Sequence, residues 1–354
     1  MRIFTLPAVT DHDKYMQRCL QIARAGQGRV APNPMVGAVL VHRDQIIGEG
    51  FHRVFGGPHA EVNAIRNVRD RDLLPESTLY VNLEPCAHVG KTPPCADLII
   101  ASGIPKVVVA QVDPNPIVGG KGILKLRQAG VDVTTGVFEE DALFLNRRFN
   151  TYHSQNRPYI VLKWAQTANG FMDQSREDFQ TGINWISHPF TKKMVHKWRS
   201  EEEAIIVGAG TIRNDDPELT VRGWFGKSPM RVALSQKGEL PQSSAVFGDS
   251  QPIWIINNVH EKISGKEEWM MGKNNETLPE TAARVLYERG LTSVLVEGGA
   301  QTLQSFIEAG LWDEARVIVS DVTFRSGLNA PLLSVSATSR QNYGRDQIFQ
   351  YFRI

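Results

Sequence analysis

The chain has 354 residues, a length that predicts two domains, and its 42% hydrophobic and 22% charged content is ordinary for a soluble globular protein. Its 39 basic and 38 acidic residues leave a formal net charge of +1, which argues against a broad nucleic-acid-binding surface. Three cysteines are typical of a reducing cytoplasm, the first 15 residues lack the pattern of a signal peptide, and no apolar run approaches the roughly 18 residues that a membrane span needs.

Helices and strands alternate in the first half of the chain. The patterns predict helices over residues 13–26, 59–65, 95–101 and 122–129, and strands over residues 35–41, 45–51, 78–83, 106–112 and 131–135. This alternation favours a layered α/β domain with its functional site where strands lead into helices.

A metal-binding pattern lies at two of these junctions. His59 and Glu61 are two residues apart, and Cys86 and Cys95 follow later in the chain. One imidazole and two thiolates suit Zn²⁺ and leave its fourth position open for water, while Glu61 can move a proton from water to a leaving amine. The pattern predicts a zinc hydrolytic deaminase. The alternatives are a closed zinc site or cysteines that only pack, but closed sites typically use four protein ligands.

The spacing of the two cysteines narrows the class of deaminase. Nucleic-acid and nucleoside deaminases with this layout usually carry two residues between the cysteines, whereas eight residues separate Cys86 from Cys95 here. The longer loop brings Lys91 and Thr92 beside the metal, where they can hold a phosphorylated or polar substrate.

A polar segment over residues 141–157 predicts the domain junction. A second α/β series follows, with strands over residues 159–167, 204–208, 230–234, 252–257, 293–297 and 316–320 and helices over residues 189–200, 280–289 and 301–309. The charged segment over residues 262–277 is predicted to be a surface excursion.

The second half offers phosphate-binding features but no GxGxxG motif after a strand, so a Rossmann dinucleotide site is not supported. Glu297-Gly298-Gly299 lies between a strand and a helix, and is either an anion-binding turn or a plain turn. Arg199 and Arg222 are either a phosphate clamp or surface arginines. Lys163 either points into a pocket or lies at the edge of the sheet, and Trp185 is by residue type more often a core residue.

No proton relay or covalent nucleophile is apparent in this half, which fits a cofactor that supplies the chemistry, such as a nicotinamide.

Over essentially its whole length the chain resembles the bifunctional deaminase/reductase family of bacterial riboflavin biosynthesis. The motifs of the first half are Pro32-Asn33-Pro34, Pro58-His59-Ala60-Glu61, the segment from Glu84 to Cys95 that ends Thr-Pro-Pro-Cys, and Asp113-Pro114-Asn115-Pro116. Those of the second half are Lys163 to Gly170, Trp185-Ile186-Ser187, Gly210-Thr211, Asp215-Asp216-Pro217, Leu219 to Arg222 and Glu297-Gly298-Gly299.

The resemblance implies two domains and two consecutive reactions. A cytidine-deaminase-like three-layer αβα domain over residues 1–147 would deaminate 2,5-diamino-6-ribosylamino-4(3H)-pyrimidinone 5′-phosphate. An α/β domain similar to dihydrofolate reductase, over residues 157–354, would then reduce the ribosyl group to ribityl with NADPH. The family also implies a homo-oligomer, either a dimer or a tetramer, and no nucleic-acid or membrane partner.

The resemblance also implies roles for individual residues. One Zn²⁺ would be held by His59, Cys86 and Cys95, with Glu61 as the catalytic proton carrier. The implied substrate-binding residues are Asn33, Lys91, Arg199, Leu219, Arg222 and Glu297. The implied cofactor-binding residues are Ala165, Trp185, Thr211, Asp215, Gly299, Ala300, Gln301, Thr302, Leu303, Gln304 and Ser305.

Three positions depart from the family pattern. Lys91 stands where arginine is frequent, Asn169 where aspartate is common and Ile183 where serine is common. The last two affect only the reductase, so a deaminase with an inactive reductase half is one alternative. The others are a nucleoside or RNA deaminase with a binding-only second domain, and a non-enzymatic zinc protein.

Overall fold

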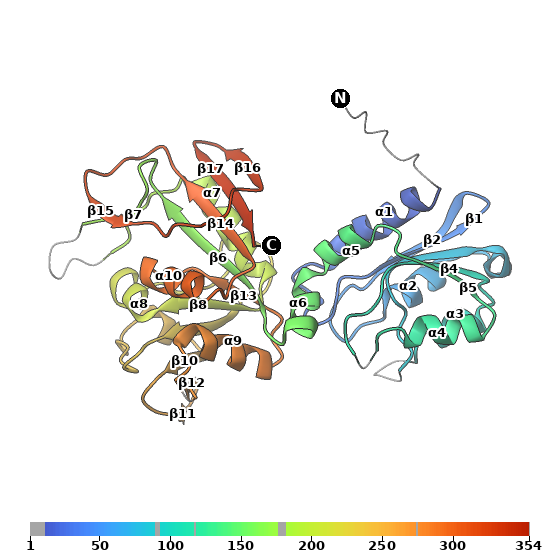
Figure 1. Ribbon diagram of the computed structural model, residues 1–354, viewed down its shortest axis with the longest axis horizontal. Coiled ribbons are helices and arrows are strands. Elements are labelled where there is room, and N and C mark those ends of the chain that lie inside the picture. The colour runs from blue at the N-terminus through green and yellow to red at the C-terminus, as the bar shows by residue number, and fades with distance from the viewer. Residues whose placement is uncertain (1–10, 89–92, 117, 176–181, 274, 354) are drawn as a thin grey trace. The chain divides into compact units, whose positions relative to one another are not determined.

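The computed structural model describes residues 11–88, 93–116, 118–175, 182–273 and 275–353. The chain forms two compact units, Met1–Gln155 and Asn156–Ile354 (Figure 1). The polar segment predicted as the junction is largely helical, because it forms α5 (Glu139–Leu145) and α6 (Arg147–Gln155) at the end of the first unit.

The first unit is built on a five-stranded mixed sheet of order β2-β1-β3-β4-β5. Its strands are β1 (Gly37–His42), β2 (Gln45–Phe51), β3 (Thr78–Leu83), β4 (Lys106–Gln111) and β5 (Asp132–Thr135). β1 is antiparallel to β2 and β3, whereas β3, β4 and β5 run parallel. A left-handed turn at Arg43 and Asp44 joins β1 to β2.

Helices cover both faces of this sheet. α1 (Asp11–Ala23) and α5 pack on one face, against Val39, Val41 and Tyr80. The other face, with Leu40 and Leu79, is covered by α2 (Ala60–Arg66), α3 (Cys95–Ala101) and α4 (Lys121–Gln128). Because alternate residues of a strand point to opposite faces, the strands are buried on both sides, and the unit is the expected three-layer αβα domain (Figure 1).

The second unit contains a ten-stranded sheet of order β11-β12-β10-β9-β8-β13-β6-β14-β17-β16. Seven neighbouring strands run parallel: β12 (Glu267–Met271), β10 (Ile253–Asn257), β9 (Met230–Leu234), β8 (Ala204–Gly208), β13 (Ser293–Val296), β6 (Tyr159–Gln166) and β14 (Glu314–Val319). β11 (Lys262–Ser264) and the hairpin of β16 (Ser339–Tyr343) and β17 (Asp346–Phe352) add antiparallel edges. β7 (Phe171–Gln174) and β15 (Gly327–Asn329) form a separate pair.

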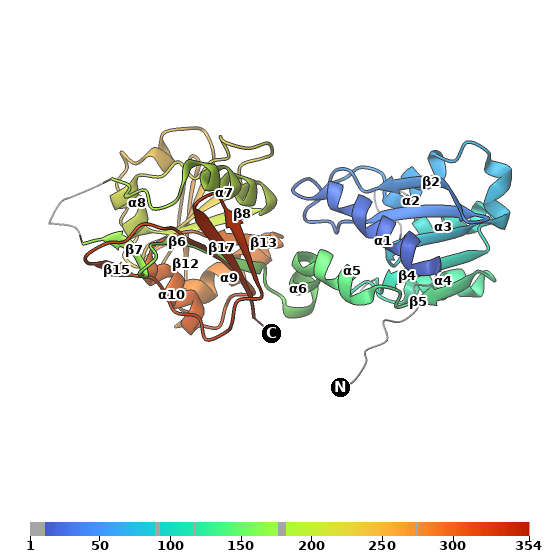
Figure 2. The ribbon, with the colours of Figure 1, turned by 90° about the horizontal axis from the view of Figure 1, so that it is seen from above.

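Helices also cover both faces of this sheet (Figure 2). α9 (Leu278–Glu288) and α10 (Ala300–Glu308) pack on one face, where Leu286 and Phe306 join the largest cluster of buried apolar side chains. α7 (Pro189–Glu201) and α8 (Ala209–Asp215) pack on the other face through Trp198 and Ile212. The carboxyl ends of the parallel strands therefore share one edge, which is where ligands bind in such sheets.

The predicted surface excursion over residues 262–277 is wrong. Residues 267–271 form β12, which pairs with β10. Met270 is buried in the apolar cluster under α9 and α10, and Trp269 in the cluster that contains Ile212 of α8. The apolar run is short and has charged neighbours, so the pattern resembled a loop. The terminal hairpin of β16 and β17 was not predicted either, because β16 is polar and largely exposed and β17 mixes polar and apolar residues without a regular alternation.

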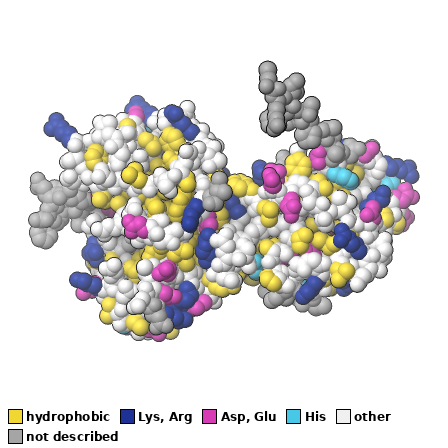
Figure 3. Space-filling model, in the orientation of Figure 1, with side chains coloured by type: hydrophobic (Ala, Val, Ile, Leu, Met, Phe, Trp, Pro, Cys, Tyr) yellow, Lys and Arg dark blue, Asp and Glu magenta, His cyan; other side chains and the backbone are white. Residues whose placement is uncertain are grey.

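Charges of both signs occur side by side on each unit in the view of Figure 3. Within the described residues, no helix has the length and apolar character required to cross a bilayer.

Candidate metal centre and reductase cleft

The three predicted metal ligands meet at the edge of the first sheet. His59 caps the start of α2, Cys86 follows β3 and Cys95 begins α3. Nδ1 of His59 lies 3.6 Å from Sγ of Cys86 and 3.3 Å from Sγ of Cys95, and all three ligand atoms lie within 4.8 Å of one another. Tetrahedral bonds of about 2.1 Å to nitrogen and 2.3 Å to sulfur require N···S separations of about 3.6 Å. The geometry and the donor set both fit Zn²⁺.

The two thiols differ in acidity. Hydrogen bonds with Cys95 and His59 lower the pKa of the Cys86 thiol to about 4, and the Cys95 backbone N–H also donates to its Sγ over 3.3 Å. The same contact, together with burial, raises the pKa of Cys95. Both thiols bind a metal ion as thiolates, so metal binding displaces the protons that they carry.

Glu61 lies in the first turn of α2 and is only 3% exposed. Burial raises the pKa of its carboxyl group to about 7, although His59 acts in the opposite direction. The side chain can therefore hold or release a proton near neutral pH, which a proton carrier requires.

Asn33 reaches this site through a histidine that the sequence analysis did not identify. Asn33 Nδ2 lies 3.1 Å from Nε2 of buried His52, whose Nδ1 lies 3.0 Å from the carbonyl oxygen of Pro58. A carbonyl oxygen accepts only, so Nδ1 carries the proton and Nε2 accepts from the Asn33 amide. Burial lowers the pKa of His52, which favours this neutral form. The ring centroids of His52 and His59 are 5.6 Å apart, so Asn33 is connected to the predicted metal ligand His59 through the ring of His52.

Glu84 fixes the backbone on the other side of Cys86. Its buried carboxylate accepts hydrogen bonds of 2.8–3.2 Å from the N–H groups of Asp113, Gly120, Gly122 and Ile123. A side chain at Gly122 would place its Cβ 1.9 Å from the carbonyl oxygen of Pro85, so the close approach requires glycine. The only sequence signal for this role was the position of Glu84 next to Pro85-Cys86. Lys91 and Thr92, the predicted substrate contacts in the cysteine loop, lie outside the described residues.

In the second unit, a cleft of about 1220 Å³ runs along the carboxyl ends of the parallel strands. Its walls include eight of the residues implied by resemblance: Thr211, Asp215, Glu297, Gly299, Ala300, Gln301, Thr302 and Ser305. Ile183, one of the departures from the family pattern, also lines it. Ala165, Trp185, Arg199, Leu219, Arg222, Leu303 and Gln304 do not. Leu303 is fully buried among core side chains, so its side chain cannot face a ligand.

The starts of α8 and α10 come close together in this cleft. A Cβ at Gly208 would lie 2.3 Å from Oγ1 of Thr302, and one at Gly299 would lie 3.2 Å from Oγ1 of Thr211. Gly299 also has a φ of +36°, which L side chains rarely adopt. Glycine is therefore favoured at position 208 by close packing and at position 299 by the backbone conformation, and backbone N–H groups at the start of α10 lie next to the cavity.

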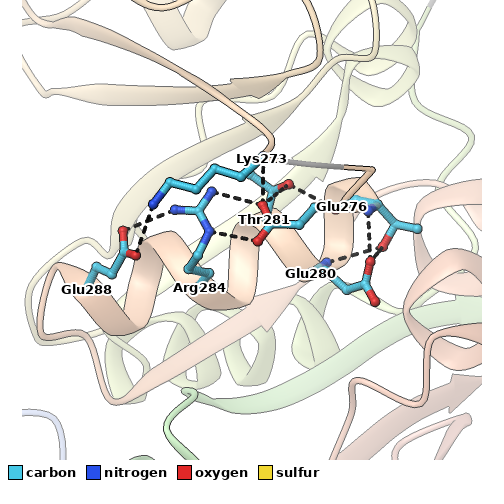
Figure 4. Close-up of polar contacts among 7 residues, drawn as sticks. Lys273, Glu276, Glu280, Thr281, Arg284 and Glu288 are labelled. Carbon is cyan, nitrogen blue, oxygen red and sulfur yellow. Dashed lines mark hydrogen bonds and ion pairs between the residues drawn. The ribbon is translucent and has the colours of Figure 1, made fainter.

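A carboxylate on the cleft wall is neutralised from within the protein. Glu276 lines the cleft, but both of its oxygens accept hydrogen bonds from Arg284 of α9, over 2.9 and 3.0 Å (Figure 4). The side chain of Arg284 also contacts Glu288, and Glu276 accepts the backbone N–H of Lys273 as well (Figure 4).

Arg199 and Glu297 contact each other directly. Nε and Nη2 of Arg199 donate to the two carboxylate oxygens of Glu297 over 2.7 and 2.8 Å, and Nζ of Lys163 lies 3.7 Å from the same carboxylate. Lys163 therefore points inward rather than to the sheet edge. Burial would raise the pKa of Glu297, but the two cations outweigh it and lower the pKa to about 2.

Each arginine of the predicted phosphate clamp has a carboxylate partner in this structure: Arg199 pairs with Glu297 and Arg222 with Glu218. Arg222 is exposed and pairs with Glu218 over 3.0 Å. Leu219, which follows Glu218 in the chain, is buried and has a φ of +57°.

Two further positions differ from simple expectation. Trp185 is 56% exposed and has Nζ of Lys192 3.1 Å above its ring, so the interpretation of Trp185 as a core residue is wrong. Asn169 donates from Nδ2 to the carbonyl oxygen of Phe324 and accepts at Oδ1 from the Phe324 N–H. An ionised aspartate cannot donate, so asparagine suits this backbone contact.

Each of the two units matches a different known protein family. Residues 9–111 match the family model of the cytidine and deoxycytidylate deaminase zinc-binding region, and residues 158–324 match that of the RibD C-terminal domain. The riboflavin biosynthesis protein RibD of Aquifex aeolicus is 38% identical, over 96% of this chain and 98% of its own. RibD of Synechocystis is 45% identical, and the match covers 80% of this chain and 77% of the Synechocystis protein.

Solved structures agree over the same length. A diaminohydroxyphosphoribosylaminopyrimidine deaminase/5-amino-6-(5-phosphoribosylamino)uracil reductase from Thermotoga maritima matches with a TM-score of 0.85 at 37% identity, covering 96% of this chain and 98% of that one. RibD of Acinetobacter baumannii matches with the same TM-score at 30% identity, covering 97% and 98%. The predicted fold class, a cytidine-deaminase-like domain followed by a reductase domain, is confirmed. The chain belongs to the RibD family of bifunctional riboflavin biosynthesis enzymes.

Proposed function

We propose that this protein catalyses two consecutive steps of riboflavin biosynthesis. The first unit removes an amino group hydrolytically from 2,5-diamino-6-ribosylamino-4(3H)-pyrimidinone 5′-phosphate. The second unit reduces the ribosyl group of the product to ribityl with NADPH. The observation that carries the proposal is the cluster of His59, Cys86 and Cys95, with ligand atoms within 4.8 Å, beside the buried carboxyl group of Glu61.

In the deaminase, His59, Cys86 and Cys95 hold Zn²⁺, which supplies the Lewis acidity that makes water nucleophilic at neutral pH. Glu61 accepts the proton that water loses as it adds to the amino-bearing ring carbon. It then donates that proton to the departing amine, so that ammonia leaves and a carbonyl group remains. Asn33, oriented by His52, and Lys91 bind the substrate.

In the reductase, NADPH would supply a hydride to the sugar carbon that is reduced, and the medium would supply the proton that completes the reduction. The proposed cofactor contacts are Ala165, Trp185, Thr211, Asp215 and the segment from Gly299 to Ser305, to which buried Leu303 contributes its backbone alone. The residues of this set that line the cleft support the assignment most directly. Arg199, Leu219, Arg222 and Glu297 are the proposed substrate contacts. Because Arg199 is paired with Glu297, the two act as one unit in which Glu297 accepts hydrogen bonds from substrate hydroxyl groups and Arg199 fixes its position.

The test is to incubate the purified, zinc-loaded protein with the diaminopyrimidinone ribosyl phosphate and NADPH. Ammonia release and loss of absorbance of the reduced nicotinamide are followed together. Both signals, with ammonia release abolished by a chelator, support the proposal. Ammonia without NADPH oxidation leaves a deaminase with an inactive reductase. If a folded sample gives neither ammonia release nor NADPH oxidation, this substrate is excluded. RNA and free nucleosides are then assayed as the alternative substrates.

We also propose, from the family resemblance, that the protein is a cytoplasmic homo-oligomer. Sedimentation analysis of the full chain tests the assembly, and a monomer at micromolar concentration would contradict it.

A further inference from the structure

Asn146, between α5 and α6, contacts the loop that carries Asn33. Its Oδ1 accepts the backbone N–H of Met35 over 2.8 Å, and its Nδ2 donates to the carbonyl oxygen of Met35 over 3.0 Å. Asn146 is only 2% exposed, and it lies outside residues 9–111, which match the deaminase family model. A side-chain amide offers a donor and an acceptor side by side, so it binds both polar groups of one backbone residue as a neighbouring strand does.

A second buried asparagine binds the same loop. Nδ2 of Asn82 also donates to the carbonyl oxygen of Met35, over 3.0 Å, and its Oδ1 accepts the backbone N–H of Gly37 over 2.7 Å. Asn82 lies near the end of β3, the strand that leads to Cys86. The carbonyl oxygen of Met35 therefore accepts two hydrogen bonds, and the loop is fixed to the strand that precedes a predicted metal ligand.

The same helical segment also contacts the strand on the other side of β3. Oδ1 of Asn150, on α6, accepts a hydrogen bond from Nε2 of Gln111 over 2.6 Å. Gln111 ends β4 and precedes Asp113 by two residues. In the sheet order, β1 and β4 lie on either side of β3. Residues 146–150 therefore hold the chain on both sides of the strand that leads to Cys86.

The position of Met35 affects that of Asn33 because a proline lies between them. The ring of Pro34 fixes its own φ, and its Cδ disfavours a helical backbone at Asn33. The three residues therefore form a stiff unit, so a shift of the Met35 peptide is passed on to the Asn33 side chain. Nδ2 of Asn33 lies 3.1 Å from Nε2 of His52, and such a shift would disturb this contact.

We propose that Asn146 is a positioning residue of the deaminase, which holds the Met35 peptide so that the amide of Asn33 is oriented towards the substrate. This inference rests on the proposed function of the first unit. It extends the parts of the chain needed for deamination to the junction of α5 and α6, beyond the residues that match the deaminase family model.

The test measures kcat and KM for ammonia release by the zinc-loaded full chain with the diaminopyrimidinone ribosyl phosphate. For Asn146→Ala we expect the KM to rise roughly tenfold and kcat to change less than about threefold, because the metal ligands and Glu61 stay in place. Zinc content and reduction of the deaminated substrate should be unchanged. The matched control is Asn67→Ala, which removes an exposed asparagine at the opposite end of α2 from His59 and should leave the KM within about twofold.

A double variant separates positioning from a general loss of stability. In the Asn33→Ala background, Asn146→Ala should raise the KM by less than about a further twofold, because it acts through a side chain that is already absent. Additive effects of the two substitutions, or an unchanged KM in Asn146→Ala alone, overturn the inference. Asn146→Ser keeps one hydrogen-bonding group and should give a smaller rise, and it replaces Asn146→Ala in the comparison if that variant is purified without zinc.

Hydrogen exchange keeps the inference separate from the proposed function. The N–H group of Met35 donates to Asn146, so it should exchange slowly in the wild type and roughly tenfold faster in Asn146→Ala. Equal exchange rates in the two proteins contradict the role of Asn146. If the wild type releases no ammonia from this substrate, the proposed function fails, and the exchange rates still decide whether Asn146 fixes this loop.

Discussion

Arg199 and Glu297 lie 98 residues apart in the chain, yet they form a two-point ion pair at the edge of the second sheet. Arg199 lies in the last turn of α7, whereas Glu297 follows β13. Both side chains are largely buried, so the charge of each depends on the other. Two residues that the sequence assigned separately to substrate binding are therefore one structural unit.

Replacing Glu297 should destabilise the second unit. Glu297→Gln leaves the charges of Arg199 and Lys163 without their shared partner, and loss of one member of a buried ion pair costs about 3–5 kcal/mol. All seven tryptophans lie in the second unit, so tryptophan fluorescence during urea unfolding reports on that unit alone. Reduction should also be lost while ammonia release persists. The exposed ion pair of Arg222 and Glu218 offers the control. Glu218→Gln should change the unfolding free energy by less than about 1 kcal/mol.

The same pair predicts a dependence on acid. The pKa of Glu297 is about 2 in the folded protein, below its ordinary value of 4.5. A lowered folded-state pKa contributes stability that is complete above about pH 4.5 and is lost as the pH falls towards 2. The difference in unfolding free energy between wild type and Glu297→Gln should therefore shrink over this range. A difference that stays constant down to pH 2 would show that the carboxylate is not stabilised by the pair.

Glu61→Gln should separate chemistry from metal binding. The amide keeps nearly the same shape and leaves the three metal ligands intact, but it cannot carry the proton. We expect deamination to fall roughly 10²–10⁴-fold, with zinc content and reduction of the deaminated substrate unchanged. Metal analysis of the purified variant gives the zinc content. Retention of full activity would favour the non-enzymatic interpretation of the zinc site.

Metal removal should affect one activity only. A chelator is expected to abolish ammonia release, whereas NADPH oxidation with the deaminated substrate should continue, because that cleft contains no part of the cysteine cluster. Zinc binding must also displace the proton of Cys95, whose pKa is raised, so zinc affinity should fall as the pH is lowered. A deamination profile that stays flat down to about pH 4 would contradict a zinc-dependent mechanism.

His52 should act through Asn33. His52→Phe removes the acceptor that orients the Asn33 amide, and we expect the KM for deamination to rise about tenfold with zinc content unchanged. Asn33→Ala should have a similar effect, and the double variant should be little worse than either single one, because the two residues work as a pair. Full additivity of the two effects would show that they act independently.

The sequence alone determined the local features of this protein. The alternation of apolar and polar residues located most helices and strands within one or two residues, since these patterns depend on neighbours in the chain. The identity and spacing of His59, Glu61, Cys86 and Cys95 defined a zinc site, because few other ligand sets have that composition.

Only the tertiary structure decided how distant residues combine. It paired Arg199 with Glu297, placed His52 against Asn33, and brought Asn146 against Met35. It also inserted residues 267–271 into the sheet and exposed Trp185, where composition predicted a loop and a core residue. These outcomes depend on sheet order and on packing between segments far apart in the chain. A local pattern records that a residue is polar or apolar, but the partner that satisfies it is fixed only when the chain folds.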